Sequence, residues 1–217
     1  MNNQTIDAQL LQAEVAIHNA TTNDAVKSAM ALYGYDTTKV AENQALLDQG
    51  KTLHTKQKKE YGEQYSATDA LSKSMKTADK WYIKHVKIAR IALKNERGIW
   101  QSLQINGRRK KSQSGWVSQA TVFYLNALSN PDVLTAMNQF GVSQEVLAST
   151  QLLVQDVANK LSIQLKETGE AQDATIKRDE ALDLLMDWMS DFKAIARIAL
   201  EDDAQLLEML GIVKAAA

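Results

Sequence analysis

The chain repeats itself at a constant spacing of 107 residues, and this restricts its fold more than any other feature of the sequence. The hexapeptide at 88–93, Ile-Ala-Arg-Ile-Ala-Leu, returns unchanged at 195–200, and Trp81 corresponds to Trp188. At the same spacing Asn19, Ala20, Asn23, Val26, Ala29, Met30 and Gly34 fall on Asn126, Ala127, Asn130, Val133, Ala136, Met137 and Gly141. We therefore predict two homologous helical repeats, 1–107 and 108–217, packed as two domains or as a single bundle.

The composition favours helices. Ala, Leu, Gln, Lys and Glu are abundant, and the 217 residues include one proline and nine glycines, so long helices are rarely interrupted. The predicted fold class is all-α: a tandem duplication of a roughly four-helix unit, forming an antiparallel helical bundle with internal pseudo-two-fold symmetry. Cysteine is absent, which excludes disulfides. The N-terminus does not resemble a secretory signal and no apolar run reaches about 20 residues, so we expect a cytoplasmic protein with no membrane span.

Capping residues at equivalent positions mark the helix boundaries. Side chains that can accept a bond from a free backbone N–H stand at three pairs of predicted starts, Asn23 and Asn130, Asp36 and Ser143, and Ser66 and Asp173. Glycines mark the predicted ends, namely Gly34 and Gly141, Gly62 and Gly169, and Gly107. The expected helices of the first repeat cover about 5–20, 24–33, 37–61 and 67–104, with counterparts from about 113 to 210. We expect a turn between Gly62 and Ser66, and the alternative is one very long helix.

The main difference between the repeats is an inversion of charge. Lys73, Lys76, Lys80, Lys84 and Lys94 correspond to Glu180, Asp183, Asp187, Asp191 and Glu201. On a helix, each set forms one stripe beside the predicted core face, and Ile91 or Ile198 lies in the same stripe. We predict that the lysine stripe and the carboxylate stripe face each other, within one chain or between two. The alternative is two independently solvated faces.

Arg90 and Arg197 are retained within this inversion. One interpretation is that they bind an anion from two symmetric positions, since a guanidinium group suits phosphate or carboxylate. The other, which we favour, is a structural arginine whose stem packs on the bundle and whose head bonds to a carboxylate or a helix end.

Residues 108–111, Arg-Arg-Lys-Lys, form a basic run before Trp116. Such a run can bind nucleic acid through phosphate contacts. The run is short and no DNA-reading motif surrounds it, so we favour an exposed linker between the repeats.

No pattern in the chain points to catalysis, a metal or a cofactor. The three histidines, His18, His54 and His85, correspond to Leu125, Leu161 and Phe192, and we therefore expect them at core or boundary positions. The Glu-x-x-His pairs of di-iron bundles, a Ser-His-Asp arrangement and a glycine-rich phosphate loop are all absent from the sequence. We predict no catalytic residue, no metal site and no cofactor.

The segment at 188–202, Trp-Met-Ser-Asp-Phe-Lys-Ala-Ile-Ala-Arg-Ile-Ala-Leu-Glu-Asp, is followed by Leu206-Leu207-Glu208 and Leu210-Gly211-Ile212. It resembles the C-terminal signature of an uncharacterised bacterial family of tandemly duplicated, all-helical proteins, and the likeness extends to Gly62-Glu63 and Gly169-Glu170. The resemblance implies a bacterial origin. It implies no activity, cofactor or binding residue.

Together these observations predict a non-enzymatic helical interaction or scaffold module that binds a protein partner or a second copy of itself, for example as a homodimer. The interaction candidates are Arg90, Arg197, Lys76, Lys80, Lys84, Asp183, Asp187 and Asp191. The alternative is a small-ligand or anion-binding bundle that uses Arg90 and Arg197. The third interpretation is weak nucleic-acid binding through residues 108–111.

Overall fold

Residues 4–212, the part that the computed structural model describes, form helices that are joined by turns and loops. The helices of this part are α1 (Ile6–Thr22), α2 (Asp24–Ala31), α3 (Thr37–Ala92), α4 (Arg97–Ser102), α5 (Gln113–Ser129), α6 (Pro131–Asn138), α7 (Gln144–Ala199) and α8 (Ala204–Met209). No strand occurs between residues 4 and 212, so the predicted all-α class is confirmed. None of the helices described is long and apolar enough to cross a membrane.

The helix lengths follow one order twice. Helices α1 to α4 have 17, 8, 56 and 6 residues, and α5 to α8 have the same lengths in the same order. Each helix of the second set begins 107 residues after its counterpart in the first.

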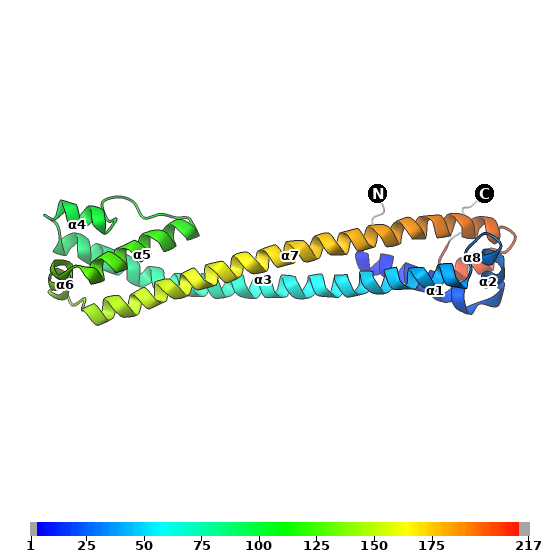
Figure 1. Cartoon of the computed structure of the whole chain (residues 1–217), viewed down its shortest axis with the longest axis horizontal. Helices are drawn as coiled ribbons and strands as arrows, with labels where there is room; N and C mark the ends of the chain where they lie inside the picture. Colours follow the sequence, from blue (N-terminus) through cyan, green and yellow to red (C-terminus); the bar gives the residue numbers. More distant parts are fainter. Residues whose placement is uncertain (1–3, 213–217) are drawn as a thin grey trace. The chain divides into compact units, whose positions relative to one another are not determined.

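The chain divides into two compact units, and each unit takes helices from both halves of the sequence. Unit 1 comprises residues 1–60 and 171–217, and so contains α1, α2, α8 and one segment each of α3 and α7. Unit 2 comprises residues 61–170, with α4, α5, α6 and the other segments of α3 and α7. Within each unit the α3 segment runs antiparallel to the α7 segment, and the short helices pack beside them (Figure 1).

Each unit has its own core. In unit 2 the ring of Tyr82 contacts those of Trp116, Phe123 and Tyr124, at centroid distances of 5.7, 5.6 and 6.2 Å. In unit 1 the ring of Phe192 lies 4.9 Å from that of Trp188 and 5.7 Å from that of Tyr35. Burial of each large apolar side chain contributes about 1.5–3 kcal/mol to stability.

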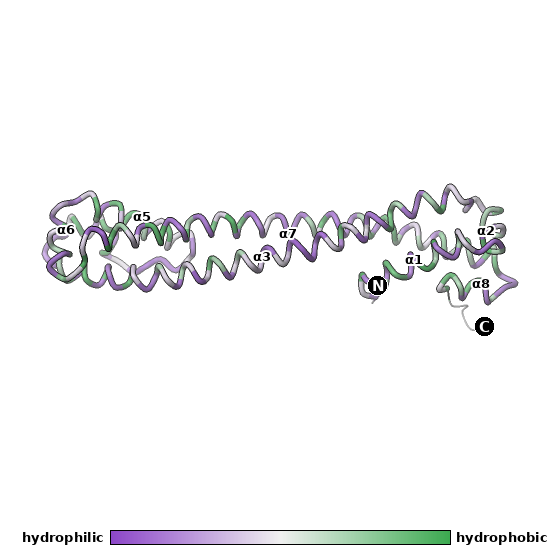
Figure 2. Tube along the Cα trace, turned by 90° about the horizontal axis from the view of Figure 1, so that it is seen from below, coloured by the Kyte–Doolittle hydropathy of each residue, from purple (hydrophilic) through white to green (hydrophobic). Residues whose placement is uncertain are grey.

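The two long helices carry a continuous seam of buried and half-buried positions. In α3 these positions recur every three or four residues, and the spacing is the same on both sides of Gly62: Leu47, Gly50, His54, Gln57, Tyr61, Gln64 and Leu71 belong to this seam. A spacing of about 3.5 residues is typical of helices that pack side by side. Hydrophilic and hydrophobic residues accordingly alternate along α3 and α7 without a long run of either kind (Figure 2).

The expected turn near Gly62 does not form, and this prediction was wrong. Helix α3 passes through Gly62 and Ser66, and α7 passes through Gly169 and Asp173. The Ser66 hydroxyl donates to the Gly62 carbonyl one turn earlier, at 2.9 Å, instead of capping a new helix. A glycine inside a helix costs only about 1 kcal/mol relative to alanine, and packing along a long seam outweighs that cost.

The last predicted helix of each repeat is in fact two helices. Helix α3 ends at Ala92 and the short α4 follows after a turn, where the expected helix continued to about residue 104. The Leu93 carbonyl accepts from the Glu96 backbone N–H at 2.9 Å and from the Trp100 indole N–H at 2.7 Å, and both bonds hold the turn between α3 and α4. Helix α8 follows α7 in the same order.

Most of the other predicted boundaries are confirmed. Four side chains accept a bond from the backbone N–H of the first turn that follows, and these are Asn23, Asp36, Asn130 and Ser143. Gly34 and Gly141 have φ angles of +83° and +74°, as expected of glycines that close a helix. After α4, however, the left-handed residue is Gln104 (φ +52°) instead of Gly107.

Candidate functional site

The two charged stripes lie in different units. Lys94 and Glu201, which were predicted in the two stripes, lie beyond the ends of α3 and α7. The lysine stripe is exposed on the α3 segment of unit 2 and consists of Lys73, Lys76, Lys80 and Lys84. The carboxylate stripe is exposed on the α7 segment of unit 1 and consists of Glu180, Asp183, Asp187 and Asp191. Neither unit therefore contains both stripes.

The charges of both stripes are left without an ion pair in the described part of the chain. The ammonium group of Lys84 lies over the ring of Trp81, 5.2 Å from the ring centroid. Unit 2 has 14 Lys and Arg against 9 Asp and Glu, a net charge of +5, and unit 1 has 11 against 17, a net charge of −6. Each unit thus offers an uncompensated charge of opposite sign.

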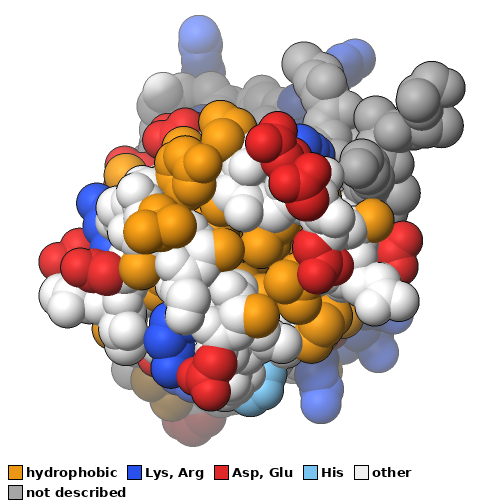
Figure 3. Space-filling model, turned by 90° about the vertical axis from the view of Figure 1, so that its right-hand side faces the viewer, with side chains coloured by type: hydrophobic (Ala, Val, Ile, Leu, Met, Phe, Trp, Pro, Cys, Tyr) orange, Lys and Arg blue, Asp and Glu red, His pale blue; other side chains and the backbone are white. Residues whose placement is uncertain are grey.

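The end of unit 1 exposes acidic and apolar groups together. Figure 3 shows this face, where Asp and Glu side chains lie around a central group of hydrophobic ones. Next to α2, Leu32 is 84% exposed. Such a mixed face is suited to contact with another protein.

Arg90 has a structural role in unit 2. Its Nε donates to the Ile105 carbonyl at 2.9 Å and one Nη donates to the Gly107 carbonyl at 2.7 Å. Arg90 therefore holds the segment that leaves α4 against α3. Arg197 is exposed, and its Nη donates to the Lys193 carbonyl at 3.5 Å. Residue 214, which corresponds to Gly107, lies outside the described residues.

The predicted linker is an exposed strap within unit 2, where it connects α4 to α5. We define the basic strap as Gly107–Lys111. Gln119, which is buried, holds the chain before the strap and the strap itself: its Nε2 donates to the Gln104 carbonyl at 3.0 Å, and its Oε1 accepts from the Lys110 backbone N–H at 2.9 Å. The middle is fixed by Asp79, which accepts from an Nη of Arg109 at 2.9 Å.

A glycine allows the strap to lie against the first turn of α5. A Cβ atom at Gly115 would stand 3.1 Å from the Cβ and Cδ of Lys110 and 2.7 Å from the Oγ of Ser112. The Ser112 hydroxyl caps α5 by accepting from the Gly115 N–H at 3.2 Å. The local sequence Ser-Gln-Ser-Gly thus both starts the helix and leaves room for the strap.

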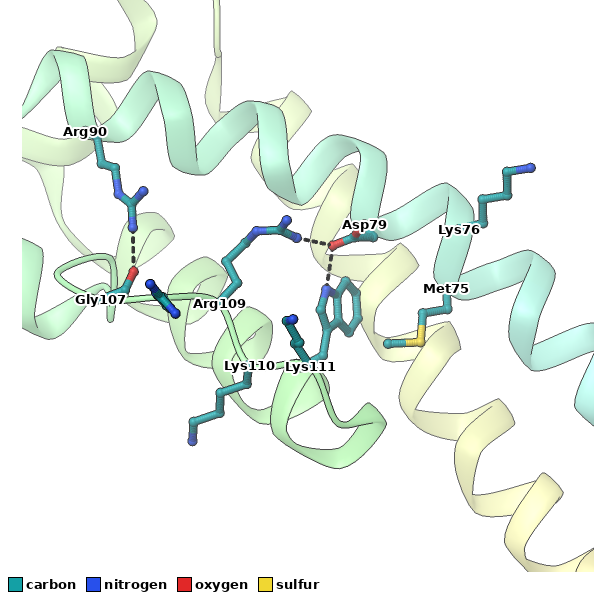
Figure 4. Close-up of a pocket in the computed structure, with 10 residues that line it drawn as sticks. Met75, Lys76, Asp79, Arg90, Gly107, Arg109, Lys110 and Lys111 are labelled. Carbon is teal, nitrogen blue, oxygen red and sulfur yellow. Dashed lines mark hydrogen bonds and ion pairs between the residues drawn. The ribbon is translucent and has the colours of Figure 1, made fainter.

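The basic strap, α3 and the start of α5 surround an open hollow of about 750 Å³, which we call the strap pocket. Its lining consists of Met75, Lys76, Asp79, Arg90, Gly107, Arg108, Arg109, Lys110, Lys111 and Trp116. Figure 4 shows Arg90 directed to Gly107 and Arg109 directed to Asp79, whereas the side chains of Lys76 and Lys110 extend away from these paired groups.

The charge of the strap pocket is strongly positive. Six of its lining residues are Lys or Arg and one is a carboxylate, Asp79. That carboxylate already accepts bonds from Arg109 and from the Trp116 indole N–H, the latter at 2.7 Å. The exposed side chains of Lys76, Arg108, Lys110 and Lys111 make no ion pair with any residue of the described chain. The pocket can therefore hold oxygen anions through charge-assisted hydrogen bonds.

The histidines lie away from the strap pocket. His85 is buried, as predicted, with Nδ1 3.0 Å from the Tyr124 hydroxyl. Burial, reinforced by the nearby charge of Lys84, lowers the pKa of His85 to about 4. His54 is half-buried in unit 1, and its hydrogen bond to Asp7, followed by the charge of Lys58, lowers the pKa of that carboxyl group. His18 is exposed on α1, so the expectation for this residue was wrong.

Sequence reasoning singled out residues 108–111 with Trp116 after them, and Arg90, but missed Asp79 and Gln119. A usable signal existed at Asp79, because it corresponds to Met186, just as Trp116 corresponds to Gln9. The repeats therefore diverge beside a pair of arginines that both retain.

We compared the chain with family models, curated proteins and solved structures, and none of them matches.

Proposed function

We propose that this protein is a non-enzymatic interaction module that binds a second copy of itself, with the lysine stripe of unit 2 in one molecule docked on the carboxylate stripe of unit 1 in another. The observation that carries the proposal is the presence of two exposed stripes of opposite charge that have no ion pairs within the described chain.

The two stripes have matching geometry. Their charges follow one another at intervals of three, four and four residues on both helices, from Lys73 to Lys84 and from Glu180 to Asp191. Each helix also exposes an isoleucine of the same stripe: Ile91 is 61% exposed and Ile198 is 51% exposed. Opposite charges at matching intervals favour one register of docking, and the isoleucines add apolar contact.

The expected association is weak and sensitive to salt. Exposed ion pairs contribute about 0–1 kcal/mol each, so four pairs supply only a few kcal/mol. Salt at 0.15 M screens exposed charges beyond about 8 Å. We expect dissociation constants in the micromolar to millimolar range, increasing with ionic strength.

A tandem duplication with pseudo-two-fold symmetry is part of this proposal. It is supported by the identical helix lengths and the constant spacing of 107 residues between corresponding helices. A homodimer of the single repeat would place like charges on equivalent surfaces. Duplication allows one copy to invert its charge, which makes the surfaces complementary between molecules.

Charge-exchanged variants test the proposal. Lys76→Glu/Lys80→Glu/Lys84→Glu makes both stripes acidic, and Asp183→Lys/Asp187→Lys/Asp191→Lys makes both basic. We expect sedimentation velocity at low salt to show concentration-dependent association of the natural chain, loss of association in each variant alone, and its return when the two variants are mixed. Circular dichroism controls for folding.

Two results would refute the proposal. One is a natural chain that stays monomeric across the concentration series at low salt. The other is a pair of variants that associate as well separately as they do when mixed, because the stripes would then be irrelevant to the contact.

A further inference from the structure

The strap pocket has a feature that self-association does not explain: its cations surround one hollow instead of following a helix face. Lys76 comes from α3, whereas Arg108, Lys110 and Lys111 come from the basic strap. These four side chains are exposed and lack ion-pair partners among residues 4–212. A hollow lined by cations from two elements concentrates positive charge and attracts anions.

We propose that the strap pocket binds a small ligand that carries two or more phosphate groups. One phosphate carries at most two charges near neutral pH, and the pocket offers four unpaired cations with Arg109 as a fifth once it leaves Asp79. Arginine presents a planar fork that matches phosphate oxygens, and lysine supplies a mobile point charge.

Hydrogen bonds within unit 2 hold the backbone of the strap. Arg90 holds the Ile105 and Gly107 carbonyls, and Gln119 holds the Gln104 carbonyl and the Lys110 N–H. The backbone between these anchors is therefore fixed, while the charged ends of the side chains stay in solvent. A ligand that binds a fixed backbone loses less free energy to ordering, which raises its affinity.

The size of the pocket favours a small ligand over nucleic acid. Its volume of about 750 Å³ lies in the range of small-molecule sites, roughly 300–1,000 Å³. Nucleic acid would need positive charge that follows a backbone over many nucleotides. Here Lys76 and the strap cations all border one hollow.

The corresponding positions of unit 1 do not provide such a site. Lys76 corresponds to Asp183 there, Asp79 to Met186, and Trp116 to Gln9. The positive charge of the strap pocket is therefore specific to unit 2. The arginines that both repeats retain, Arg90 and Arg197, do not explain this difference.

Calorimetric titration with inorganic tripolyphosphate at 0.1 M salt tests the proposal on the full chain. The pocket variant is Arg108→Gln/Lys110→Gln/Lys111→Gln. The matched control is Lys73→Gln/Lys80→Gln/Lys84→Gln, which removes the same charge from the same unit outside the pocket lining. We expect the pocket variant to lose at least tenfold in affinity and the control to lose less than twofold. Circular dichroism and thermal unfolding verify that both variants fold.

A gain in affinity gives a second, independent measurement. Asp79→Asn removes the one carboxylate of the lining, frees Arg109 and keeps an oxygen acceptor for Trp116. We expect tripolyphosphate to bind this variant three- to tenfold more tightly. The indole N–H signal of Trp116, assigned with Trp116→Phe, is expected to move on titration of the natural chain.

Titrations with other phosphate compounds distinguish which kind of phosphate ligand the pocket binds. Orthophosphate is expected to bind at least tenfold more weakly than tripolyphosphate. A nucleoside triphosphate that binds more tightly than tripolyphosphate identifies a nucleotide as the ligand, and equal binding identifies the phosphate chain alone.

Three results would overturn the proposal. The first is that neither tripolyphosphate nor a nucleotide binds, and the second is that the pocket variant and the control lose equal affinity. The third is that the chain prefers duplex DNA and that the control variant weakens DNA binding as strongly as the pocket variant does. Self-association can be tested separately, because the control variant disturbs the lysine stripe and leaves the strap intact. A loss of self-association is therefore expected in the control variant, and a loss of phosphate binding in the pocket variant.

Discussion

The short helices of units 1 and 2 have the same lengths, but the two units fill their cores differently. At one position of the seam unit 1 has Gly50, whereas unit 2 has Val157, which is fully buried. The neighbours of Gly50 are leucines: a Cβ at this glycine would lie 3.3 Å from Leu10, 3.7 Å from Leu182 and 3.9 Å from Leu185. Unit 1 thus combines a small residue, Gly50, with large neighbours, whereas unit 2 has the larger Val157 at the corresponding position.

The units also differ in the polarity of their cores. Buried His85 and Tyr124 of unit 2 correspond to buried Phe192 and Ile17 of unit 1. A hydrogen-bonded pair and an apolar pair therefore occupy equivalent places in the two helix sequences. The periodic seam and the caps thus determine these helices, while volume and polarity at one position can change if the neighbours compensate.

The largest expected effect comes from exchanging His85 for the residue of unit 1. The pKa of buried His85 is about 4 against 6.5 in an unfolded chain, so between these values the unfolded state binds more protons than the folded state. Stability is therefore fully present above pH 6.5 and falls as the pH is lowered towards 4, by up to about 3 kcal/mol. His85→Phe is expected to remove this loss.

Urea unfolding of both proteins at pH 7 and pH 5 measures the effect. At pH 5 we expect the natural chain to lose about 2 kcal/mol more than the variant does, relative to their values at pH 7. Taking the difference removes the contribution of carboxyl groups, which titrate in both proteins. An equal pH dependence in the two proteins would mean that His85 is protonated in the folded state.

The next effect concerns volume. Gly50→Val brings the residue of unit 2 among the three leucines of unit 1, and overpacking of this kind costs about 1–3 kcal/mol. The control Gly62→Val adds the same atoms to the same helix, where a Cβ meets nothing within 4 Å. The midpoint of thermal unfolding is expected to fall for Gly50→Val and to change little for the control. The second substitution Leu10→Val introduces the residue that unit 2 has at the corresponding position, Val117, and is expected to restore part of the lost stability. An unchanged unfolding midpoint in Gly50→Val alone would contradict the close packing at Gly50.

The smallest effect tests the continuity of the long helices. Gly62→Ala and Gly169→Ala are each expected to stabilise the chain by about 0.5–1 kcal/mol, because alanine favours an α-helix and open space surrounds both glycines. Chemical denaturation measures the change. A left-handed turn at either position would produce the opposite sign, since alanine is strained there.

Local signals predicted much of this fold. Asn23, Asn130, Gly34 and Gly141 mark helix ends through contacts with their own neighbours in sequence, and such contacts depend little on the rest of the chain. The continuity of α3 was missed because the seam near Gly62 is polar, with Gln57 and Gln64 at half-buried positions. A polar seam beside a glycine looks like the end of a helix.

The strap pocket depends on contacts that periodicity does not specify. Trp116 and Arg109 meet Asp79 only because the strap returns along α3 after α4. The sequence also did not predict which helices form each unit, because corresponding helices have similar sequences and each half of the chain offers a long helix to pack against. The seam residues predict that α3 and α7 each need a partner, without naming which one.

The composition of the units has a consequence for proteolysis. The basic strap is exposed and contains four peptide bonds that follow Lys or Arg, so a trypsin-like protease can reach it. A cut there leaves one fragment with α1 to α4 and another with α5 to α8, and both fragments contribute residues to the core of each unit. The fragments would remain together as a non-covalent complex, because neither can leave without opening both cores.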